Sequence, residues 1–400
     1  MRECSRSDEH KLSVKERRIT LKKIIALLIL TVMCLGLLCS CSDERITPGV
    51  IGIGGIGPLS GDTSAYGTAV KNGAQLAVDE INAMGGLQFE LNFKDDKNSP
   101  STSVKAYDKL REWGMHVLLG AATTEPCLRI VDIADQHDIF TITPSASAPG
   151  VTEGHDNVFR VTYNDTAQGK AAAGYIASNA LSQKIAIIYK QDDTYSEGVY
   201  EAFKAEAERL ELEVVSESSF KEGKHDFKKT VKAAMEAEAD LLFCPVYYEP
   251  AAKIITAAAD LEYSPIFFGT DGLDGLFSVK DFNKELAEGV HLLSPIPADF
   301  TNDRTRQFME EYQSRYGILP NQFAADAYDA VYAIYAAAVQ AGVTADMSAE
   351  EMCPLLSAAM TEISVEGITG SGSSLTWDAT GEVQKSPVVV VIQSGMYVKK

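Results

Sequence analysis

Small hydroxyl side chains follow two apolar segments of strand length, at Thr123 and Thr124 and at Ser145 and Ser147. The first pair precedes a helical pattern, so its hydroxyl and N–H groups would lie at a helix N-terminus, where a carboxylate is favoured. The two serines alternate along the chain after an apolar run, so both can point toward one place. These loops could therefore bind a carboxylate, although turn or N-cap hydrogen bonding is the simpler alternative for each residue.

The elements that would position these loops alternate between strand and helix patterns. Strand-like runs in the first half, at residues 50–56, 87–93, 116–119 and 139–142, are separated by helical patterns at residues 69–84, 101–113 and 126–136. The rhythm restarts with runs at 184–189, 213–218, 241–245 and 266–269, separated by helical patterns at 196–210, 226–237 and 250–261. Helices at 303–316 and 323–340 and a last strand at 387–393 follow. This order predicts an α/β fold with two doubly wound parallel-sheet lobes.

The motifs of enzymes are absent from this sequence. Residues 52–57 match the G-x-G-x-x-G spacing of dinucleotide-binding turns, but residues 58–62 continue as a loop where that motif needs a helix, so we assign these glycines to a first strand. The histidines are isolated, and Cys127, Cys244 and Cys353 are scattered, which favours buried thiols over a disulfide framework or a metal site. We expect no enzymatic activity, no cofactor and no metal.

An apolar stretch at residues 24–38 follows several basic side chains between Lys15 and Lys23. Its 15 residues would span about 22 Å as a helix, short of a membrane core of ~30 Å, so a secretory signal is favoured over a transmembrane helix. The sequence Leu38-Cys39-Ser40-Cys41 resembles the bacterial lipobox. We therefore predict a signal peptide at residues 1–40, and a lipidated Cys41 with a tether at 41–48 that anchors the chain to the lipid bilayer on the outer face of the cytoplasmic membrane.

The net charge excludes one class of partner. The first 40 residues hold eight of the 36 basic and four of the 56 acidic side chains, so the mature chain carries a charge of about −24. Such a chain repels nucleic acid, and we expect no nucleic-acid function.

Many short segments together resemble the type I periplasmic binding proteins, and most closely the leucine/isoleucine/valine-binding proteins of amino-acid ABC importers. The matching segments include Pro58-Leu59-Ser60-Gly61, Tyr66-Gly67, the run from Asn72 to Gly86, Gly120-Ala121-Ala122-Thr123-Thr124, Thr143-Pro144-Ser145-Ala146-Ser147, Phe159-Arg160, Phe268-Gly269-Thr270-Asp271-Gly272 and Leu375-Thr376-Trp377-Asp378. The resemblance covers residues 50–400 and implies two lobes joined by a hinge of three crossovers.

The resemblance also implies roles for particular residues. Thr124 and Ser147 would bind the ligand carboxylate, with Thr123 as the alternative because the loop at 120–126 is shorter than in well-known relatives. The Ser145 carbonyl and the Asp271 carboxylate would accept from the ligand ammonium, whereas Asp274 is expected to be an exposed turn residue. The aromatic positions that would close over the ligand are Tyr195 and either Tyr247 or Tyr248, and Tyr66 would contact the ligand side chain from the first lobe. A structural aromatic side chain is the alternative for each of them.

The function implied is an extracytoplasmic, monomeric substrate-binding lipoprotein that captures a free amino acid with a branched or other aliphatic side chain and delivers it to an ABC permease. We expect lobe 1 at residues 49–163 plus 296–373 and lobe 2 at 164–295 plus 374–400, with crossovers near 161–165, 292–297 and 372–376. Two alternatives stay open: a receptor for a neutral amide, urea or short-chain acid, and a ligand sensor that does not take part in transport.

Overall fold

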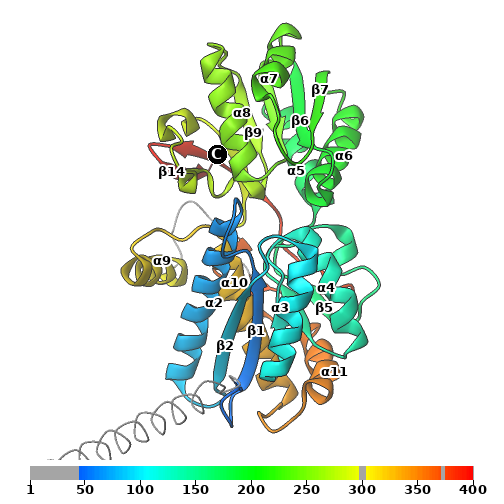
Figure 1. The fold of residues 1–400 in the computed structure, drawn as a ribbon, viewed down its shortest axis with the longest axis vertical. Helices are drawn as coiled ribbons and strands as arrows, with labels where there is room; N and C mark the ends of the chain where they lie inside the picture. Colours follow the sequence, from blue (N-terminus) through cyan, green and yellow to red (C-terminus); the bar gives the residue numbers. More distant parts are fainter. Residues whose placement is uncertain (1–44, 297–302, 371–373, 400) are drawn as a thin grey trace, which may run out of the picture. The chain divides into compact units, whose positions relative to one another are not determined.

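The computed structural model describes residues 45–296, 303–370 and 374–399 and contains two large sheets (Figure 1). The first sheet has five parallel strands in the order β2-β1-β3-β4-β5. Their bounds are β1 Ile51–Gly57, β2 Phe89–Asp95, β3 Val117–Leu119, β4 Thr141–Thr143 and β5 Val158–Arg160. We call this sheet and its helices the first lobe.

Helices cover both faces of the first sheet because the strands alternate buried side chains between two apolar clusters. One cluster joins Ile51 and Ile53 to α2 (Ser64–Met84) and α10 (Gln322–Ala341). The other joins Ile56 to α3 (Pro100–Trp113) and α4 (Thr124–Gln136). The remaining helices of this part of the chain are α9 (Asp303–Tyr316) and α11 (Ala349–Met360).

The second lobe is built on a seven-stranded sheet in the order β14-β13-β10-β9-β8-β6-β7. Its strands are β6 Ile185–Lys190, β7 Val214–Phe220, β8 Leu241–Cys244, β9 Ile266–Gly269, β10 His291–Ser294, β13 Val388–Gln393 and β14 Met396–Lys399. Helices α5 (Asp165–Ser178) and α6 (Thr194–Arg209) pack in one cluster on this sheet. Helices α7 (Phe227–Glu236) and α8 (Tyr248–Asp260) pack in the other. The doubly wound prediction is confirmed, with the addition that β13 and β14 pair antiparallel.

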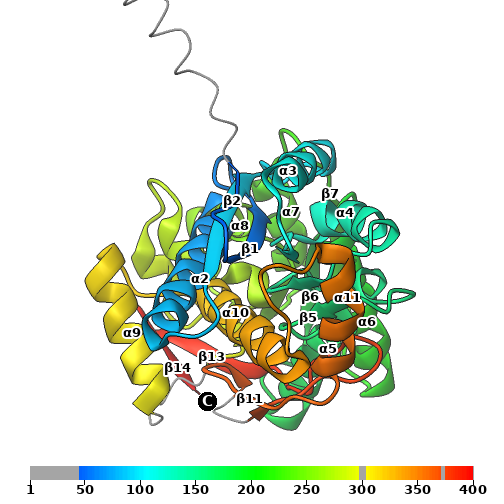
Figure 2. The same ribbon diagram turned by 90° about the horizontal axis from the view of Figure 1, so that it is seen from below.

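Two helices of the first lobe that are distant in the sequence lie side by side, α2 and α10 (Figures 1 and 2). Their close approach depends on Gly73, where an added Cβ would lie 2.0 Å from the carbonyl oxygen of Ala324. This contact fixes the start of α10, and with it Phe323, against the middle of α2.

The chain passes between the lobes after β5, after β10 and before β13. Before the third passage, the Trp377 indole N–H donates to the Arg160 carbonyl at 2.7 Å, and the Lys385 ammonium lies 2.6 Å from Asp326 of α10. The stretch up to Lys385 therefore packs on the first lobe. The sequence had predicted the third crossover earlier in the chain, near residues 372–376. Residues 297, 372 and 373 of the predicted crossovers lie outside the described residues, and the lobe limits stay a prediction.

The local features predicted for β1 and for the cysteines agree with the structure. The glycines of residues 52–57 form β1, where Gly55 makes room for the Phe93 ring, and the next helix begins only at Ser64. The thiols of Cys127, Cys244 and Cys353 are free and buried.

Candidate ligand-binding site

A cavity of about 230 Å³, including its opening, lies where the carboxyl ends of strands from both sheets meet. The first lobe contributes loops that follow β3 and β4, and the second contributes residues that follow β6, β8 and β9. The lining residues are Tyr66, Ala122, Thr123, Thr124, Ser145, Ser147, Tyr195, Tyr247, Asp271, Gly272 and Phe323. Loops outside the carboxyl ends of strands are where α/β sheets bind ligands.

The structure brings together eight of the nine residues named from the sequence, and Tyr248 is the exception. The Tyr248 phenol oxygen accepts from the Ala65 amide at 3.2 Å, and its ring packs edge-on against Tyr66 with the centroids 4.8 Å apart. Tyr247 therefore faces the cavity. Ala122, Gly272 and Phe323 were missed, because no local pattern marks an alanine before Thr123, a glycine after Asp271 or the first turn of α10 as part of a site.

The polar groups of the first lobe are held from behind by the backbone. Ser145 donates its hydroxyl to the Ala122 carbonyl at 2.6 Å, and the Ser147 amide donates to the Thr124 hydroxyl oxygen at 3.3 Å. Thr123 is the N-cap residue of α4, yet its buried hydroxyl has no hydrogen-bond partner among the described residues. This hydroxyl and the first turn of α4 are therefore available as donors to an anionic group.

Asp271 provides the negative charge at the other side of the cavity. Its side chain is 4% exposed, and one carboxylate oxygen accepts from the Tyr195 hydroxyl at 2.7 Å. Burial raises the pKa of Asp271 to about 7, an effect that the Tyr195 hydrogen bond partly offsets and that nearby Asp326 strengthens. A cation placed in the cavity would stabilise the ionised form.

Aromatic rings form most of the remaining wall. Tyr195 and Tyr247 stack with ring centroids 5.1 Å apart, and Phe323 packs against Tyr66 at 4.2 Å. Tyr66 also donates its hydroxyl to the Gly272 carbonyl at 2.5 Å, which joins the first lobe to the second at the cavity. The cavity thus has hydroxyl and amide donors on one side, a carboxylate on the other and aromatic rings between them.

Comparison with known proteins identifies the family. The model of the periplasmic binding protein family matches residues 50–395. The chain belongs to this family. The resemblance to type I members of the branched-chain amino acid group is confirmed.

Relatives of this periplasmic binding protein include the Leu/Ile/Val-binding protein BraC3 of Rhizobium johnstonii, which is 32% identical over 227 residues. That alignment covers 56% of this chain and 62% of BraC3, less than two thirds of the relative's length. The crystal structure of the branched-chain amino acid transporter substrate binding protein LivJ of Streptococcus pneumoniae, in complex with isoleucine, is 28% identical with a TM-score of 0.79, covering 88% of this chain and 100% of LivJ. A solute binding protein of R. palustris in complex with benzoate shares the fold, with a TM-score of 0.79 at 21% identity, covering 88% of this chain and 95% of that one.

Asp274 of this periplasmic binding protein is buried, whereas the sequence predicted an exposed turn residue. Its side chain is 2% exposed and accepts from the Gln322 amide at 2.8 Å and from the Tyr397 hydroxyl at 2.5 Å. Burial raises its pKa to about 6. The sequence could not place it, since its partners come from α10 and from β14, a strand that the pattern did not predict.

Within residues 45–296, 303–370 and 374–399, no group of three or more His, Cys, Asp and Glu side chains could hold a metal ion. No helix in those ranges is long and apolar enough to cross a membrane. Residues 24–38 and Cys41 lie outside them.

Proposed function

We propose that this protein binds a free amino acid with a branched or other aliphatic side chain between its two lobes and delivers it to an ABC permease. The single observation that carries the proposal is the buried Asp271 carboxylate, which faces a cavity whose opposite side offers hydroxyl and amide donors. A zwitterion needs both kinds of partner at once, because burying either of its charges without one is unfavourable.

Each end of the amino acid has a defined place in this proposal. The ligand carboxylate accepts from the Thr124 amide and from the hydroxyls of Thr124 and Ser147, with Thr123 as a further donor because its hydroxyl has no other described partner. The ligand ammonium donates to Asp271 and to the Ser145 carbonyl. A charge-assisted hydrogen bond is about twice as strong as a neutral one, so the Asp271 contact contributes most to orientation.

The residues that line the cavity also indicate which ligand side chain it accepts. Its wall of Tyr66, Tyr195, Tyr247 and Phe323 provides apolar surface. These apolar walls favour an aliphatic amino acid over one with a charged side chain.

An acid without an ammonium group is the alternative that the charge argues against. None of the eleven residues that line the cavity is Lys or Arg, and Asp271 would repel a carboxylate such as benzoate. A neutral amide or urea would leave Asp271 without the cation that stabilises its ionised form. The amino acid is the ligand class that satisfies both sides of the cavity.

Localisation and partners follow from the sequence and the family. Membership of the periplasmic binding proteins supports export, and the lipobox-like residues before Cys41 support a lipid anchor. Closure of the lobes around the ligand would present the form that a permease recognises, with the population shifted by the binding energy. A sensor that reports the ligand without transport would use the same closure. Amino-acid uptake by cells that lack the protein distinguishes the two roles, because uptake falls only if the protein serves transport.

The binding proposal is tested by thermal unfolding of residues 42–400 with each of the twenty amino acids, acetamide, urea, benzoate and short-chain acids. A ligand at 100 times its dissociation constant adds ~2.7 kcal/mol to the free energy of unfolding. Stabilisation by leucine, isoleucine or valine supports the proposal. Stabilisation by amides or acids alone would contradict it.

A further inference from the structure

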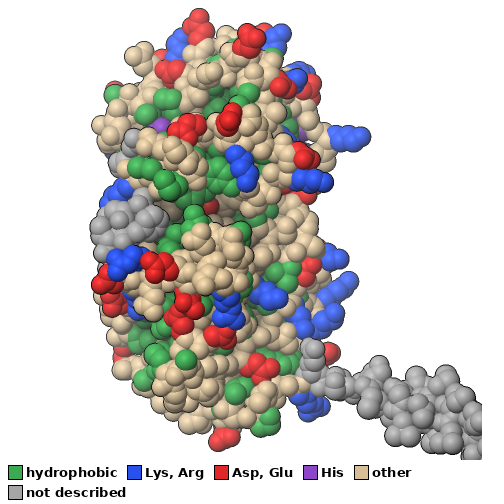
Figure 3. Space-filling view, turned by 90° about the vertical axis from the view of Figure 1, so that its left-hand side faces the viewer, with side chains coloured by type: hydrophobic (Ala, Val, Ile, Leu, Met, Phe, Trp, Pro, Cys, Tyr) green, Lys and Arg blue, Asp and Glu red, His purple; other side chains and the backbone are tan. Residues whose placement is uncertain are grey.

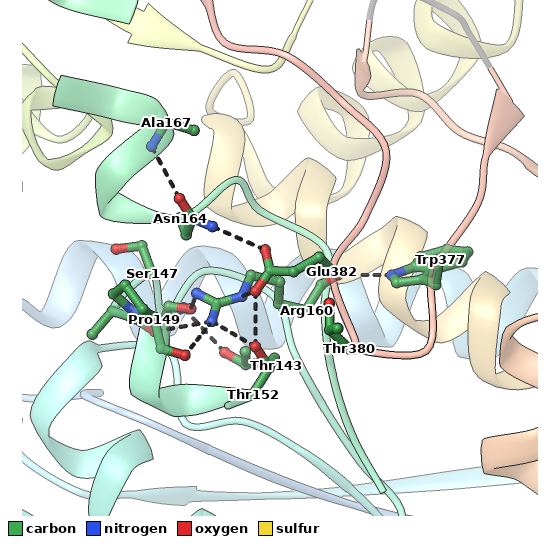
Figure 4. Close-up of polar contacts among 12 residues, drawn as sticks. Thr143, Ser147, Pro149, Thr152, Arg160, Asn164, Ala167, Trp377, Thr380 and Glu382 are labelled. Atoms are coloured by element: carbon green, nitrogen blue, oxygen red, sulfur yellow. Dashed lines mark hydrogen bonds and ion pairs between the residues drawn. The ribbon is translucent and has the colours of Figure 1, made fainter. Parts of the chain in front are cut away.

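A buried arginine lies directly behind the pocket loop that carries Ser145 and Ser147 (Figure 4). Arg160 ends β5, and its side chain is 0% exposed. Its guanidinium donates to the Ala146 carbonyl at 3.1 Å and to the Ala148 carbonyl at 2.9 Å. These carbonyls flank Ser147 in the chain, so Arg160 holds the back of the loop whose front lines the cavity.

Glu382 neutralises this arginine from the segment that precedes the third passage between the lobes. One carboxylate oxygen lies 2.9 Å from Arg160 Nε and accepts from the Thr152 hydroxyl at 2.8 Å. The segment is also attached to the backbone of β5 by two hydrogen bonds from residues that precede Glu382. Trp377 donates to the Arg160 carbonyl at 2.7 Å, and the Arg160 amide donates to the Gly381 carbonyl at 3.0 Å.

The first helix of the second lobe begins at the same cluster. Asn164 is the N-cap of α5, where its side-chain oxygen accepts from the Ala167 amide at 2.9 Å. Its side-chain nitrogen donates to the second carboxylate oxygen of Glu382 at 3.3 Å (Figure 4). The next residue, Asp165, donates its amide to the Ser147 carbonyl at 2.9 Å. The N-terminus of α5 therefore contacts both the hinge carboxylate and the pocket loop.

These contacts fall into two groups that a hinge motion would affect differently. The contacts of Arg160 with Ala146, Ala148 and Glu382 lie within the first lobe, so separation of the lobes leaves them in place. The contact of Asn164 with Glu382 joins a first-lobe segment to a second-lobe helix and must change when α5 moves.

We propose that Arg160 and Glu382 are positioning residues that couple the hinge angle, through Asn164, to the position of the pocket loop. Neither residue lines the cavity. The inference rests on the proposed function, in which this loop binds the ligand carboxylate. Closing the hinge completes two bonds from the start of α5, from Asn164 to Glu382 and from the Asp165 amide to the Ser147 carbonyl, which together place Ser147 for the ligand. Opening the hinge releases both bonds, while Arg160 keeps its contacts with the loop.

The first test is Asn164→Ser, because serine retains N-cap hydrogen bonding but lacks the amide donor. Asn283→Ser is the matched control, since Asn283 caps a short second-lobe helix (Lys284–Ala287) by accepting from the Glu285 amide. We expect N164S to weaken binding of leucine, isoleucine or valine about tenfold, as for the loss of one hydrogen bond to a charged group. N283S should bind like the wild type. Equal affinities in N164S and the wild type would overturn the proposal.

A double-mutant cycle with Glu382→Gln separates the hinge bond from a simple cap effect. If Asn164 acts through the Glu382 carboxylate, N164S has a smaller effect on affinity in the E382Q background than in the wild type. The same loss in both backgrounds would contradict the coupling. Should E382Q fail to fold by circular dichroism, Asn164→Asp replaces it, because aspartate keeps the cap but places a like charge beside Glu382. N164D must then lose more affinity than N164S.

The hinge is also measured without ligand, by the distance between spin labels at Lys105→Cys on α3 and Lys229→Cys on α7. Both positions are exposed, and the native thiols of Cys127, Cys244 and Cys353 are buried, so labels attach to the introduced cysteines. N164S should shift the ligand-free distribution toward longer distances than N283S does. An unchanged distribution overturns the coupling even where the wild type binds no amino acid, so this failure is distinct from failure of the proposed function.

Discussion

Protonation of Asp271 should release the ligand at acidic pH. Burial raises the pKa of this carboxyl to about 7 in the ligand-free protein, and an ammonium can pair only with its ionised form. Lowering the pH from 7 to 5 therefore converts the site from about half ionised to about 1% ionised. The free amino acid keeps its ammonium and carboxylate charges over this range.

The size of the effect follows from these populations. The ratio of ionised fractions predicts that the association constant falls roughly 50-fold between pH 7 and pH 5, or ~2.3 kcal/mol in binding free energy. Asp271→Asn removes the titrating group, so its affinity should vary little with pH. It should also bind more than a hundredfold more weakly at pH 8, because removing one member of a buried charge pair costs ~3–5 kcal/mol.

Isothermal titration calorimetry with the best-bound amino acid, from pH 5 to pH 8, measures both effects. Asp274→Asn is the matched control, because Asp274 is also a buried acid whose pKa is raised to about 6, yet it contacts Gln322 and Tyr397 and does not line the cavity. The control should keep the wild-type pH profile. A wild-type affinity that does not change between pH 5 and 7, or a D271N variant that binds like the wild type, would refute the ammonium-pairing role.

Three further outcomes are expected. Without ligand, the raised pKa of Asp271 gives this carboxyl a stabilising contribution that is complete below pH ~4 and is lost as the pH rises through about 7. In urea unfolding, D271N should therefore be more stable than the wild type at pH 8, by up to ~4 kcal/mol, but not at pH 4. Tyr66→Phe removes the hydroxyl that donates to the Gly272 carbonyl across the lobes and should weaken ligand binding by ~0.5–1.5 kcal/mol, seen as a faster dissociation rate in stopped-flow fluorescence. Lys385→Met leaves Asp326 buried without its cation, since both side chains are at most 2% exposed, and should lower the free energy of unfolding by ~3–5 kcal/mol in urea, whereas adding Asp326→Asn should recover much of that loss.

Charged side chains of both signs lie on the surface of the protein. On the face shown in Figure 3, basic and acidic side chains are interspersed, and no large patch of one sign stands out. The net negative charge of the chain is thus not gathered at one place on this face.

Local patterns were sufficient for most strands and helices but not for all. The strand at Ile266–Gly269 and the helix at Asp303–Tyr316 have the predicted bounds. Helix α5 was not predicted, because its sequence is rich in alanine and glycine and has little apolar periodicity. The tertiary structure explains those small residues, since an added Cβ at Gly169 would lie 2.5 Å from the Phe203 amide nitrogen of α6.

What the sequence alone determined is the alternation of strands and helices, the polar residues at strand ends and, through resemblance, their convergence on one site. These depend on short-range periodicity and on motifs that can be read within a few residues. Only the tertiary structure decided which neighbouring tyrosine faces the cavity, that Phe323 completes its wall, and that Asp274 is buried. It also decided that Arg160 and Glu382 pair behind the pocket loop. Each of these depends on partners more than forty residues away, and burial by distant segments leaves no periodic trace in the sequence around the buried residue.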